Sequence, residues 1–372
     1  MERYRKTIYC DWEFITTLLS KQEEETSCLD NSFNIDNEVA TNIQQLLLCS
    51  DVKLYLNVSS NFFYDLLDAI EKKRKNALKK GRDPQLSTIE KFVIDIALKQ
   101  QNNVLHLHFN ATKVQFNDSI IDTNKLNALF FSCESKEVCA KAMKEFGIIV
   151  FCAENINDFK YLTFDQGVAI QKTETSNWSQ CLGGHDIVPC NSLVIVDNYI
   201  LNDADSIDEN LPKIFNALIP ISLNRLMPFH VTIFATLCND RGINYNSETR
   251  LAKIKNILNE IRPDITFEVS IIKCSKDKFH DRTIITNNLY ISCGGGFDLY
   301  RNGKSKKTTT VSVFHPFLNT HTKWSKKAYS NVLIDVSKVF NSTSVFDAEK
   351  MTDAFPCFAV GNKNNRLIIS NQ

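Results

Sequence analysis

The first half of the chain alternates short apolar runs with longer amphipathic stretches. Runs rich in β-branched and aromatic residues predict strands, and these are "TIYCDWEFI", "VKLYLNVS" and "VLHLHFNATKV". Apolar residues at helical spacing predict helices in "NFFYDLLDAIEKKRKNALKK" and "SKEVCAKAMKEFG", the second of which leads into a buried strand, "IIVFCAEN". Alternation of strands with helices predicts an α/β domain.

The second half repeats this alternation. A strand in "SLVIVDNYIL" and a helix in "ENLPKIFNALIPI" are followed by a strand in "FHVTIFATL". The next stretch, "SETRLAKIKNILNEIRP", predicts a helix that Ser247 caps and Pro263 ends. Further strands are predicted in "ITFEVSIIKCS", "RTIITNNLYISC" and "TTTVSVFHPF", so a second α/β unit is expected.

A polar segment separates the two halves. Residues 172–190, "KTETSNWSQCLGGHDIVPC", contain glycine and proline and show no period, which predicts a linker. A chain of 372 residues is long enough for two cores of ordinary size. We therefore expect two α/β domains, residues 1–180 and residues 186–372.

Charge and cysteine content restrict the class of protein. The 43 basic and 43 acidic residues cancel, so binding of nucleic acid or membrane must come from local clusters. The 12 cysteines are scattered and several lie in apolar runs, as is typical of buried thiols in a reducing compartment. The N-terminus lacks a signal-peptide hydrophobic region, and no run reaches the roughly 18 apolar residues of a membrane helix. We expect a cytoplasmic protein without a transmembrane segment.

One stretch of the second half, "KFHDRTIITNNLYISCGGGFDLY", carries candidate chemistry. His280 and Arg282 share a predicted strand face, Asn287 follows after four residues, and the three glycines begin after six more. This spacing resembles the phospholipase D superfamily motif His-x-Lys, four residues, Asp, six residues, Gly-Ser-x-Asn. The resemblance implies that His280 attacks phosphorus. The phosphate-binding residues expected from the stretch and its basic rim are Arg282, Gly294, Gly295, Gly296 and Lys304.

The order of elements around this stretch is similar to the phospholipase D-like domain that follows microtubule-interacting-and-transport (MIT) domains. The Asp-Pro-Tyr-Ile strand, His-Asp-Arg motif and Gly-Arg-Gly-Leu-Asp turn of that family correspond to residues 197–200, 280–282 and 294–298. The likeness covers about residues 190 to 340. It implies a non-catalytic, binding version of the fold with anionic phospholipid and protein partners.

Several positions depart from the catalytic motif. Arg282 replaces lysine, which keeps the charge and improves bidentate contact with phosphate. Asn287 replaces the aspartate that would orient the histidine, and Gly295 and Phe297 replace Ser and Asn. Catalysis in this superfamily also needs a second histidine, which a homodimer pairing two copies of His280 would supply. These departures favour anion binding or a role in the fold over catalysis.

Acidic residues near predicted strand ends form the second candidate site. Asp11 ends the apolar run "TIYCD", and Glu134 and Glu154 flank the predicted helix and strand of "SKEVCAKAMKEFGIIVFCA". This arrangement resembles PIN-like nucleases, and the resemblance implies that the acids bind Mg²⁺ or Mn²⁺ and activate a water against a phosphodiester. Glu38 would be a fourth ligand. The alternative is that Asp11 caps the following helix while both glutamates are solvated.

Basic clusters indicate the kind of partner. Seven Lys and Arg residues fall within residues 72–82, and Arg301, Lys304, Lys306 and Lys307 follow the triple glycine. Such runs attract nucleic acid or another phosphate-bearing polyanion, although a solvated helix face is the default for the first.

Together these patterns predict an intracellular nucleic-acid-processing effector, in microbial defence or toxicity. Its N-terminal domain would be a metal-dependent phosphodiesterase and its C-terminal domain would bind phosphate. Two alternatives stay open. One is a non-enzymatic module that binds an anionic lipid or a protein through the phospholipase D-like domain. The other is a phospholipase D-type nuclease that acts as a His280 homodimer.

Overall fold

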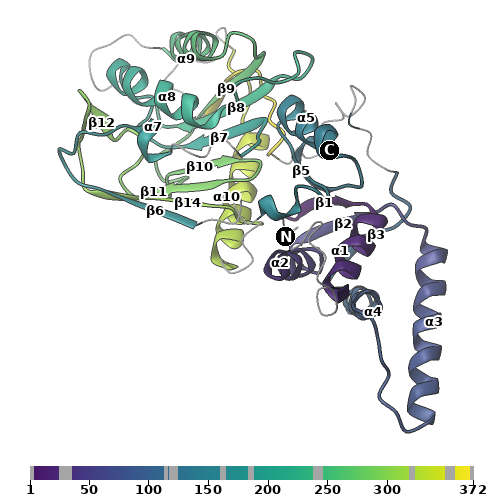
Figure 1. Cartoon of the computed structure of the whole chain (residues 1–372). Coiled ribbons are helices and arrows are strands. Elements are labelled where there is room, and N and C mark those ends of the chain that lie inside the picture. Colours follow the sequence, from purple (N-terminus) through teal and green to yellow (C-terminus); the bar gives the residue numbers. More distant parts are fainter. Residues whose placement is uncertain are drawn as a thin grey trace. The chain divides into compact units, whose positions relative to one another are not determined.

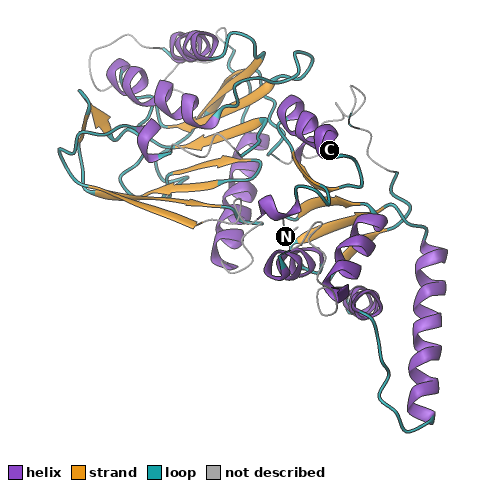
Figure 2. Ribbon diagram, viewed as in Figure 1, coloured by secondary structure: helices purple, strands orange, loops and turns teal. Residues whose placement is uncertain are grey.

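A computed structural model describes residues 4–24, 36–112, 116, 125–159, 165–182, 188–237, 246–317, 323–347 and 357–368. The chain divides into two compact units, Met1–Ala142 with Ile149–Thr163, and Met143–Ile148 with Phe164–Gln372 (Figure 1). Each unit combines strands with helices (Figure 2), so the predicted α/β class is confirmed.

The first unit is built on a parallel sheet. Its strands are β1 (Lys6–Cys10), β2 (Val52–Leu56), β3 (His106–His108), β4 (Ala128–Phe131) and β5 (Ile149–Phe151). The helices that connect them are α1 (Trp12–Glu24), α2 (Asn37–Leu47), α3 (Ser60–Lys79), α4 (Thr88–Gln101) and α5 (Lys136–Phe146), with 3₁₀ turns at Lys125–Asn127 and Ile156–Asp158. The strand order is β3-β2-β1-β4-β5, and every pairing is parallel. The order reverses between β1 and β4, which makes that position the topological switch point.

The first strand is shorter than predicted. It ends at Cys10, and the chain becomes helical at Trp12, so the run "WEFI" belongs to α1 and not to the strand. The reason is visible in the spacing of apolar residues after Asp11, because Phe14, Ile15, Leu18 and Leu19 recur at helical intervals and all are buried. Asp11 therefore stands in the single position between β1 and α1.

The second unit contains a larger, mixed sheet. Its strands are β6 (Asp165–Ile170), β7 (Ser192–Val196), β8 (Phe229–Ala235), β9 (Phe267–Lys273), β10 (Thr283–Thr286), β11 (Tyr290–Cys293), β14 (Thr309–Phe314) and β15 (Phe358–Gly361). They lie in the order β15-β9-β8-β7-β10-β11-β14-β6. The pairs of β8 with β7 and β9 are parallel and the other pairs are antiparallel. A small hairpin is formed by β12 (Tyr300–Arg301) and β13 (Lys304–Ser305).

The boundary between the units lies before the predicted linker. Strand β6 pairs with β14 along its whole length, from Asp165↔Phe314 to Ile170↔Thr309. The short helix α7 (Trp178–Cys181) falls inside residues 172–190, and Trp178 is fully buried, with its indole Nε1 donating to Asn210 Oδ1 (2.8 Å). The polar composition of this segment reflects turns and a capping box at Asn177 within the second unit.

The remaining helices are α8 (Ala204–Leu218), α9 (Ser247–Ile261) and α10 (Lys323–Ser342). Helix α9 ends before Pro263, as predicted, but its cap is Asn246 and not Ser247. The Asn246 side chain accepts from the amide of Thr249 (2.7 Å), whereas Ser247 is buried in the first turn. None of the described helices is long and apolar enough to cross a membrane.

Candidate functional site

The predicted acids of the first unit follow three adjacent strands. Asp11 comes directly after β1, Glu134 lies three residues after the end of β4, and Glu154 lies three residues after the end of β5. Since β1, β4 and β5 are neighbours in a parallel sheet, these residues lie at the same carboxyl edge. Ligands of open α/β sheets bind at this edge, beside the switch point.

Two of the acids share one pocket, which we call the carboxylate pocket. It has a volume of about 300 Å³ and is lined by Phe14, Thr17, Ser132, Cys133, Glu134, Ser135, Ala153 and Glu154. Glu134 is half-buried, and Glu154 is exposed at the surface. Carboxylate oxygens are the ligands preferred by Mg²⁺ and Mn²⁺, so the donor set of this pocket fits such an ion.

Asp11 does not line the carboxylate pocket and is almost fully buried, with an exposed fraction of 6%. Its Oδ1 accepts from Asn57 Nδ2 (2.7 Å), while its Oδ2 accepts from the amide of Cys133 (2.9 Å) and from Ser132 Oγ (3.2 Å). The carboxylate is therefore held by residues that follow β2 and β4. The alternative expectation was that the Asp11 side chain caps α1, but these hydrogen bonds go to Asn57, Ser132 and Cys133 instead.

Ser132 connects Asp11 to the carboxylate pocket. Its hydroxyl donates to Asp11 and accepts from the amide of Glu134 (3.2 Å), so it fixes the turn that carries Glu134. Sequence reasoning missed both Ser132 and Asn57. The signal that identifies them is a polar residue immediately after β2 and β4, as Asp11 is after β1.

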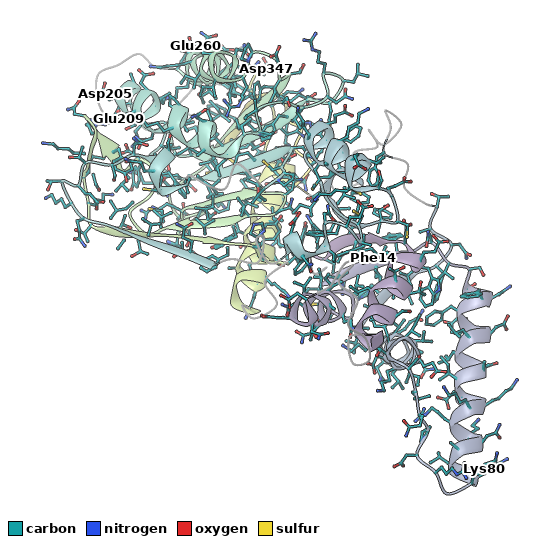
Figure 3. The ribbon with its side chains drawn as sticks, in the orientation of Figure 1. Phe14, Lys80, Asp205, Glu209, Glu260 and Asp347 are labelled. Carbon is teal, nitrogen blue, oxygen red and sulfur yellow. The ribbon has the colours of Figure 1, made fainter. Side chains whose placement is uncertain are left out.

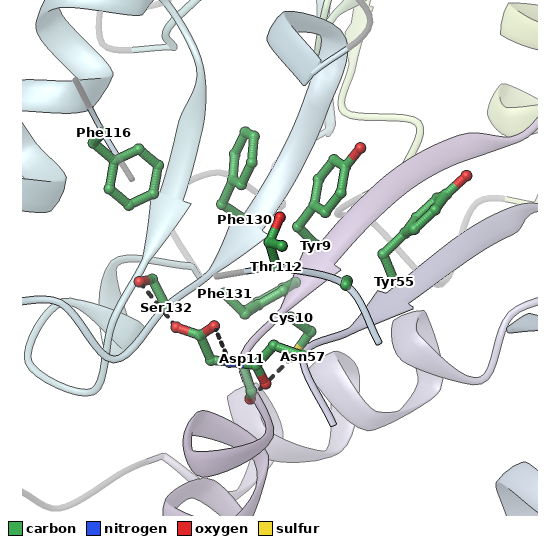
Figure 4. Close-up of a pocket in the computed structure, with 11 residues that line it drawn as sticks. Tyr9, Cys10, Asp11, Tyr55, Asn57, Thr112, Phe116, Phe130, Phe131 and Ser132 are labelled. Carbon is green, nitrogen blue, oxygen red and sulfur yellow. Dashed lines mark hydrogen bonds between the residues drawn. The ribbon is translucent and has the colours of Figure 1, made fainter. Parts of the chain in front are cut away.

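A second cavity adjoins Ser132 on the other side. It is narrow, about 10 Å³, which is close to the space that one water molecule needs. Figure 4 shows Asp11 at one end of it and the rings of Tyr9, Tyr55 and Phe130 above it. The rings of Tyr9 and Phe130 stack at 5.4 Å and those of Tyr9 and Tyr55 at 5.0 Å. Asp11 thus lines the aromatic cavity and not the wider carboxylate pocket.

The histidines of β3 continue this aromatic row. His108 stacks on Tyr55 with ring centroids 4.4 Å apart. On the same sheet face, His106 lies opposite Lys53 in the register of β3 with β2. Burial lowers the pKa of both imidazoles, and the charges of neighbouring cations, Lys53 for both, lower them further. The two histidines share a strand face, but neither lines the carboxylate pocket.

Two buried thiols lie next to the carboxylate pocket. The hydrogen bond between Cys139 and Cys152 raises the pKa of Cys139 and lowers the pKa of Cys152 to about 6. The charge of Glu154 acts in the opposite direction on Cys152, because it raises the pKa of that thiol.

Glu38 lies apart from the other acids. It is exposed in the first turn of α2, where its amide donates to the capping residue Asp36 (2.9 Å). It lines neither cavity. Over the residues that the structure describes, no group of three or more His, Cys, Asp or Glu side chains is placed to hold one metal ion. The predicted cluster of Asp11, Glu38, Glu134 and Glu154 is thus present only as the Glu134–Glu154 pair.

In the second unit, Arg282 meets the glycine turn. Its Nη1 donates to the carbonyl of Gly294 (3.3 Å), and its guanidinium carbon lies 5.9 Å from the centre of the Tyr199 ring. Lys276 lies over the same ring at 5.9 Å. His280 is exposed in the loop before β10. Two cations therefore lie over Tyr199, and one of them, Arg282, also contacts Gly294.

Asp197 is the buried centre of this region. It accepts from the amides of Tyr199 (2.7 Å) and Phe297, and a Cβ at Gly296 would come within 2.9 Å of its Oδ2. Gly296 has a φ of +82°, so both its conformation and its closeness to Asp197 require glycine. Burial raises the pKa of Asp197, although its hydrogen bonds and the charge of Arg282 lower it.

The glycine amides are largely used inside the fold. The amide of Gly295 donates to Thr309 Oγ1 (2.8 Å) and that of Gly296 to the carbonyl of Cys293 (3.0 Å). The carbonyl of Gly295 accepts from Lys307 Nζ (3.1 Å). Lys304, the lysine predicted for the phosphate site, is exposed in β13, and its neighbour Lys306 pairs with Asp298 (2.7 Å). Lys307 thus contacts the glycines, and Lys306 contacts Asp298 at the end of the same turn.

Asn287 does not lie beside His280. It is buried, and its Oδ1 accepts from the amides of Asn191 (2.8 Å) and Ser192 (3.0 Å) at the start of β7. Strand β10 separates it from Arg282. The position that the motif assigns to a histidine-orienting aspartate therefore holds the ends of two strands together.

The structure gathers the predicted residues into two separate sites. Glu134 and Glu154 share the carboxylate pocket, with Asp11 joined to it through Ser132. Arg282 meets the glycine turn of the second unit. No family model and no curated protein matches the chain. The case for each candidate site therefore rests on its geometry.

Proposed function

We propose that this protein processes nucleic acid, with a metal-dependent phosphodiesterase site in its first unit and a phosphate-binding site in its second. One observation carries the proposal: Glu134 and Glu154 line the same pocket at the carboxyl edge of a parallel sheet, beside its switch point. Acids that follow three adjacent strands also support assigning the first unit to the PIN-like nucleases.

A site with two carboxylates suits Mg²⁺, because this ion is commonly held by one or two carboxylates together with substrate phosphate and water. Glu134 and Glu154 would hold it, and Ser132 would orient Glu134 through its amide. When bound, the ion supplies Lewis-acid polarisation of the phosphodiester. Asp11 contributes by fixing the turn at Ser132 and Cys133.

The second unit is proposed to be a phospholipase D-like domain that binds phosphate without cleaving it. Arg282 and Lys276 both lie over the ring of Tyr199. The guanidinium of Arg282 has further N–H donors besides the one that binds the carbonyl of Gly294. This pair would hold a phosphate of the bound nucleic acid. The exposed position of His280 supports the alternative in which two copies of the chain bring their histidines together.

The experiment is a cleavage assay on labelled single-stranded and double-stranded DNA and RNA with Mg²⁺ or Mn²⁺. We expect cleavage that EDTA abolishes and that falls at least about a hundredfold in Glu134→Gln and Glu154→Gln, because each change removes an anionic ligand. Glu38→Gln is the matched control, since its carboxylate lies outside the pocket. His280→Ala should cleave as the unchanged protein does.

Other outcomes distinguish the alternatives. Cleavage that persists in EDTA and is lost in His280→Ala would identify phospholipase D-type catalysis by a homodimer, because that chemistry uses a covalent histidine and no metal. Absence of cleavage of every substrate with both metals would contradict the enzymatic proposal and favour a binding module.

A further inference from the structure

Helix α3 continues well beyond its last buried residue. Phe63 and Ile70 are its buried residues, and none of residues 71–83 is buried. The helix runs away from the sheet of the first unit, and Lys80 marks its far end (Figures 1 and 3). We call residues 71–83 the α3 arm. Leu78 within it is 61% exposed, so this segment gains little from packing against the fold.

The α3 arm is strongly basic. Its cations are Lys72, Lys73, Arg74, Lys75, Lys79, Lys80 and Arg82. Lys73 pairs with Glu90 (2.7 Å) and Arg74 with Glu71 (2.7 Å). Within the described part of the chain the other five form no ion pair, and all five are exposed. The unpaired charge therefore lies at the far end of the helix and on one side of it.

The unpaired lysines of the helix share the side opposite the fold. Lys72 follows Phe63 by nine residues, and Lys79 follows Ile70 by nine, which is two and a half turns in each case. Lys75 lies one turn from Lys72. These three side chains form a stripe, which we call the lysine stripe, about 10 Å long and turned away from the buried face.

An ion pair joins the first part of the arm to α4. Glu90 Oε2 accepts from the amide of Ser87 (2.8 Å) and from Lys73 Nζ (2.7 Å), so the first turn of α4 is fastened to the side of α3. Glu90 and Ser87 also form a capping box at the start of α4. The stripe is thus presented on a helix that is oriented before any partner binds, which reduces the entropy lost on binding.

We propose that the α3 arm binds double-stranded DNA by entering the major groove, with the lysine stripe on the phosphates that border it. This rests on the proposed function only in taking nucleic acid as the partner. A helix about 10–12 Å in diameter fits a groove about 12 Å wide. Along one strand, a stripe about 10 Å long faces about three phosphates. The major groove of double-stranded RNA is too narrow for a helix, so DNA is favoured.

The test measures binding of fluorescent DNA, RNA duplex and single strands by anisotropy, in EDTA and in the Glu134→Gln background so that hydrolysis plays no part. We expect the tightest binding for duplex DNA. The variant Lys72→Gln/Lys75→Gln/Lys79→Gln should weaken it about tenfold at low salt and reduce the slope of log K against log salt by about 2.7. Glutamine keeps helix propensity, so circular dichroism should be unchanged.

The control is Lys91→Gln/Lys255→Gln/Lys338→Gln, which removes the same charge from exposed positions outside the arm. Equal weakening in both triple variants, or equal affinity for single strands and RNA duplex, would overturn the proposal. Cleavage of a trinucleotide with Mg²⁺ reports on the carboxylate pocket separately. The arm variant should leave it unchanged, so loss of duplex binding and loss of hydrolysis are distinguished.

Discussion

Lys6 shows what burial does to a charge in the first sheet. It is fully buried in β1, and its Nζ donates to Asn127 Oδ1 (3.2 Å). Burial lowers the pKa of Lys6 to about 7, because a charged ammonium is poorly solvated there. The folded protein therefore holds this lysine largely neutral in mildly alkaline solution, whereas the unfolded chain keeps it charged up to the ordinary lysine pKa of 10.5.

This difference predicts a pH dependence of stability. Between pH 7 and 10.5 the unfolded chain binds the extra proton, so the free energy of unfolding should rise with pH across that window. In Lys6→Met this rise disappears. From pH 6 to pH 10 we expect the unchanged protein to gain up to about 4 kcal/mol relative to the variant, measured by urea unfolding. Lys53→Met, a half-buried lysine on β2, is the control and should track the unchanged protein.

At the scale of elements, the contact between α3 and α4 depends on one carboxylate. Burial favours the protonated form of Glu90, but the hydrogen bonds from Lys73 and from the backbone of Ser87 outweigh it and lower the pKa of Glu90 below its usual 4.5. A lowered pKa means that this stabilisation is complete above pH 4.5 and is lost as pH falls further. The α3 arm is thus fastened by charge at neutral pH.

Amide hydrogen exchange of residues 71–80 would detect this. Glu90→Gln should increase the exchange of the arm about two- to fivefold at pH 6, the range expected for an exposed ion pair. After correction for intrinsic rates, the variant and the unchanged protein should converge by about pH 3, where the carboxyl is protonated. Glu71→Gln removes an ion pair within α3 alone. If it had the same effect on the arm, the fastening to α4 would not be the cause.

At the scale of the whole molecule, the second unit depends on residues that precede its predicted start. Strand β6 covers the edge of β14, and buried Trp178 contacts both Phe297 and Tyr300. Without residues 164–185, β14 becomes an open edge and the Trp178 site becomes a cavity. Open edges pair with other chains, and removal of a buried aromatic costs about 3–5 kcal/mol.

Two fragments test this, one spanning residues 164–372 and the other residues 186–372. The longer fragment should unfold at a higher urea concentration, and the shorter one should aggregate at the same protein concentration, as seen by light scattering. Both lack Met143–Ile148, so that segment does not affect the comparison. Equal midpoints and equal scattering would show that β6 and Trp178 contribute little.

Local periodicity was sufficient for much of the fold. Helix α3 and strands β2, β7, β8 and β9 were predicted because their apolar residues follow the period of the element. Strand β6, "DQGVAI", has no such signal, because it is an edge strand whose register is set by β14, more than a hundred residues later. The cap of α9 was misplaced by one residue because Asn246 and Ser247 are equally good capping types.

The candidate sites were harder to predict for a physical reason. Asp11, Glu134 and Glu154 could be placed at one sheet edge from strand ends alone, but the direction of each carboxylate depends on distant partners. Asn57 and Ser132 turn Asp11 away from the pocket, and they lie 46 and 121 residues from it. The spacing of the motif likewise gave no indication that Arg282 would donate to the carbonyl of Gly294.

The place of Asn287 has a consequence for any attempt to engineer catalysis into the second unit. Arg282 and Asn287 stand at opposite ends of β10, about 16 Å apart along an extended strand. Asn287→Asp would place a negative charge at the junction of β7 and β10 and leave His280 as it is. The spacing between Arg282 and Asn287 follows from the length of β10. A designer would instead need to place the new carboxylate on the side of Tyr199 and Gly294, where Arg282 already lies.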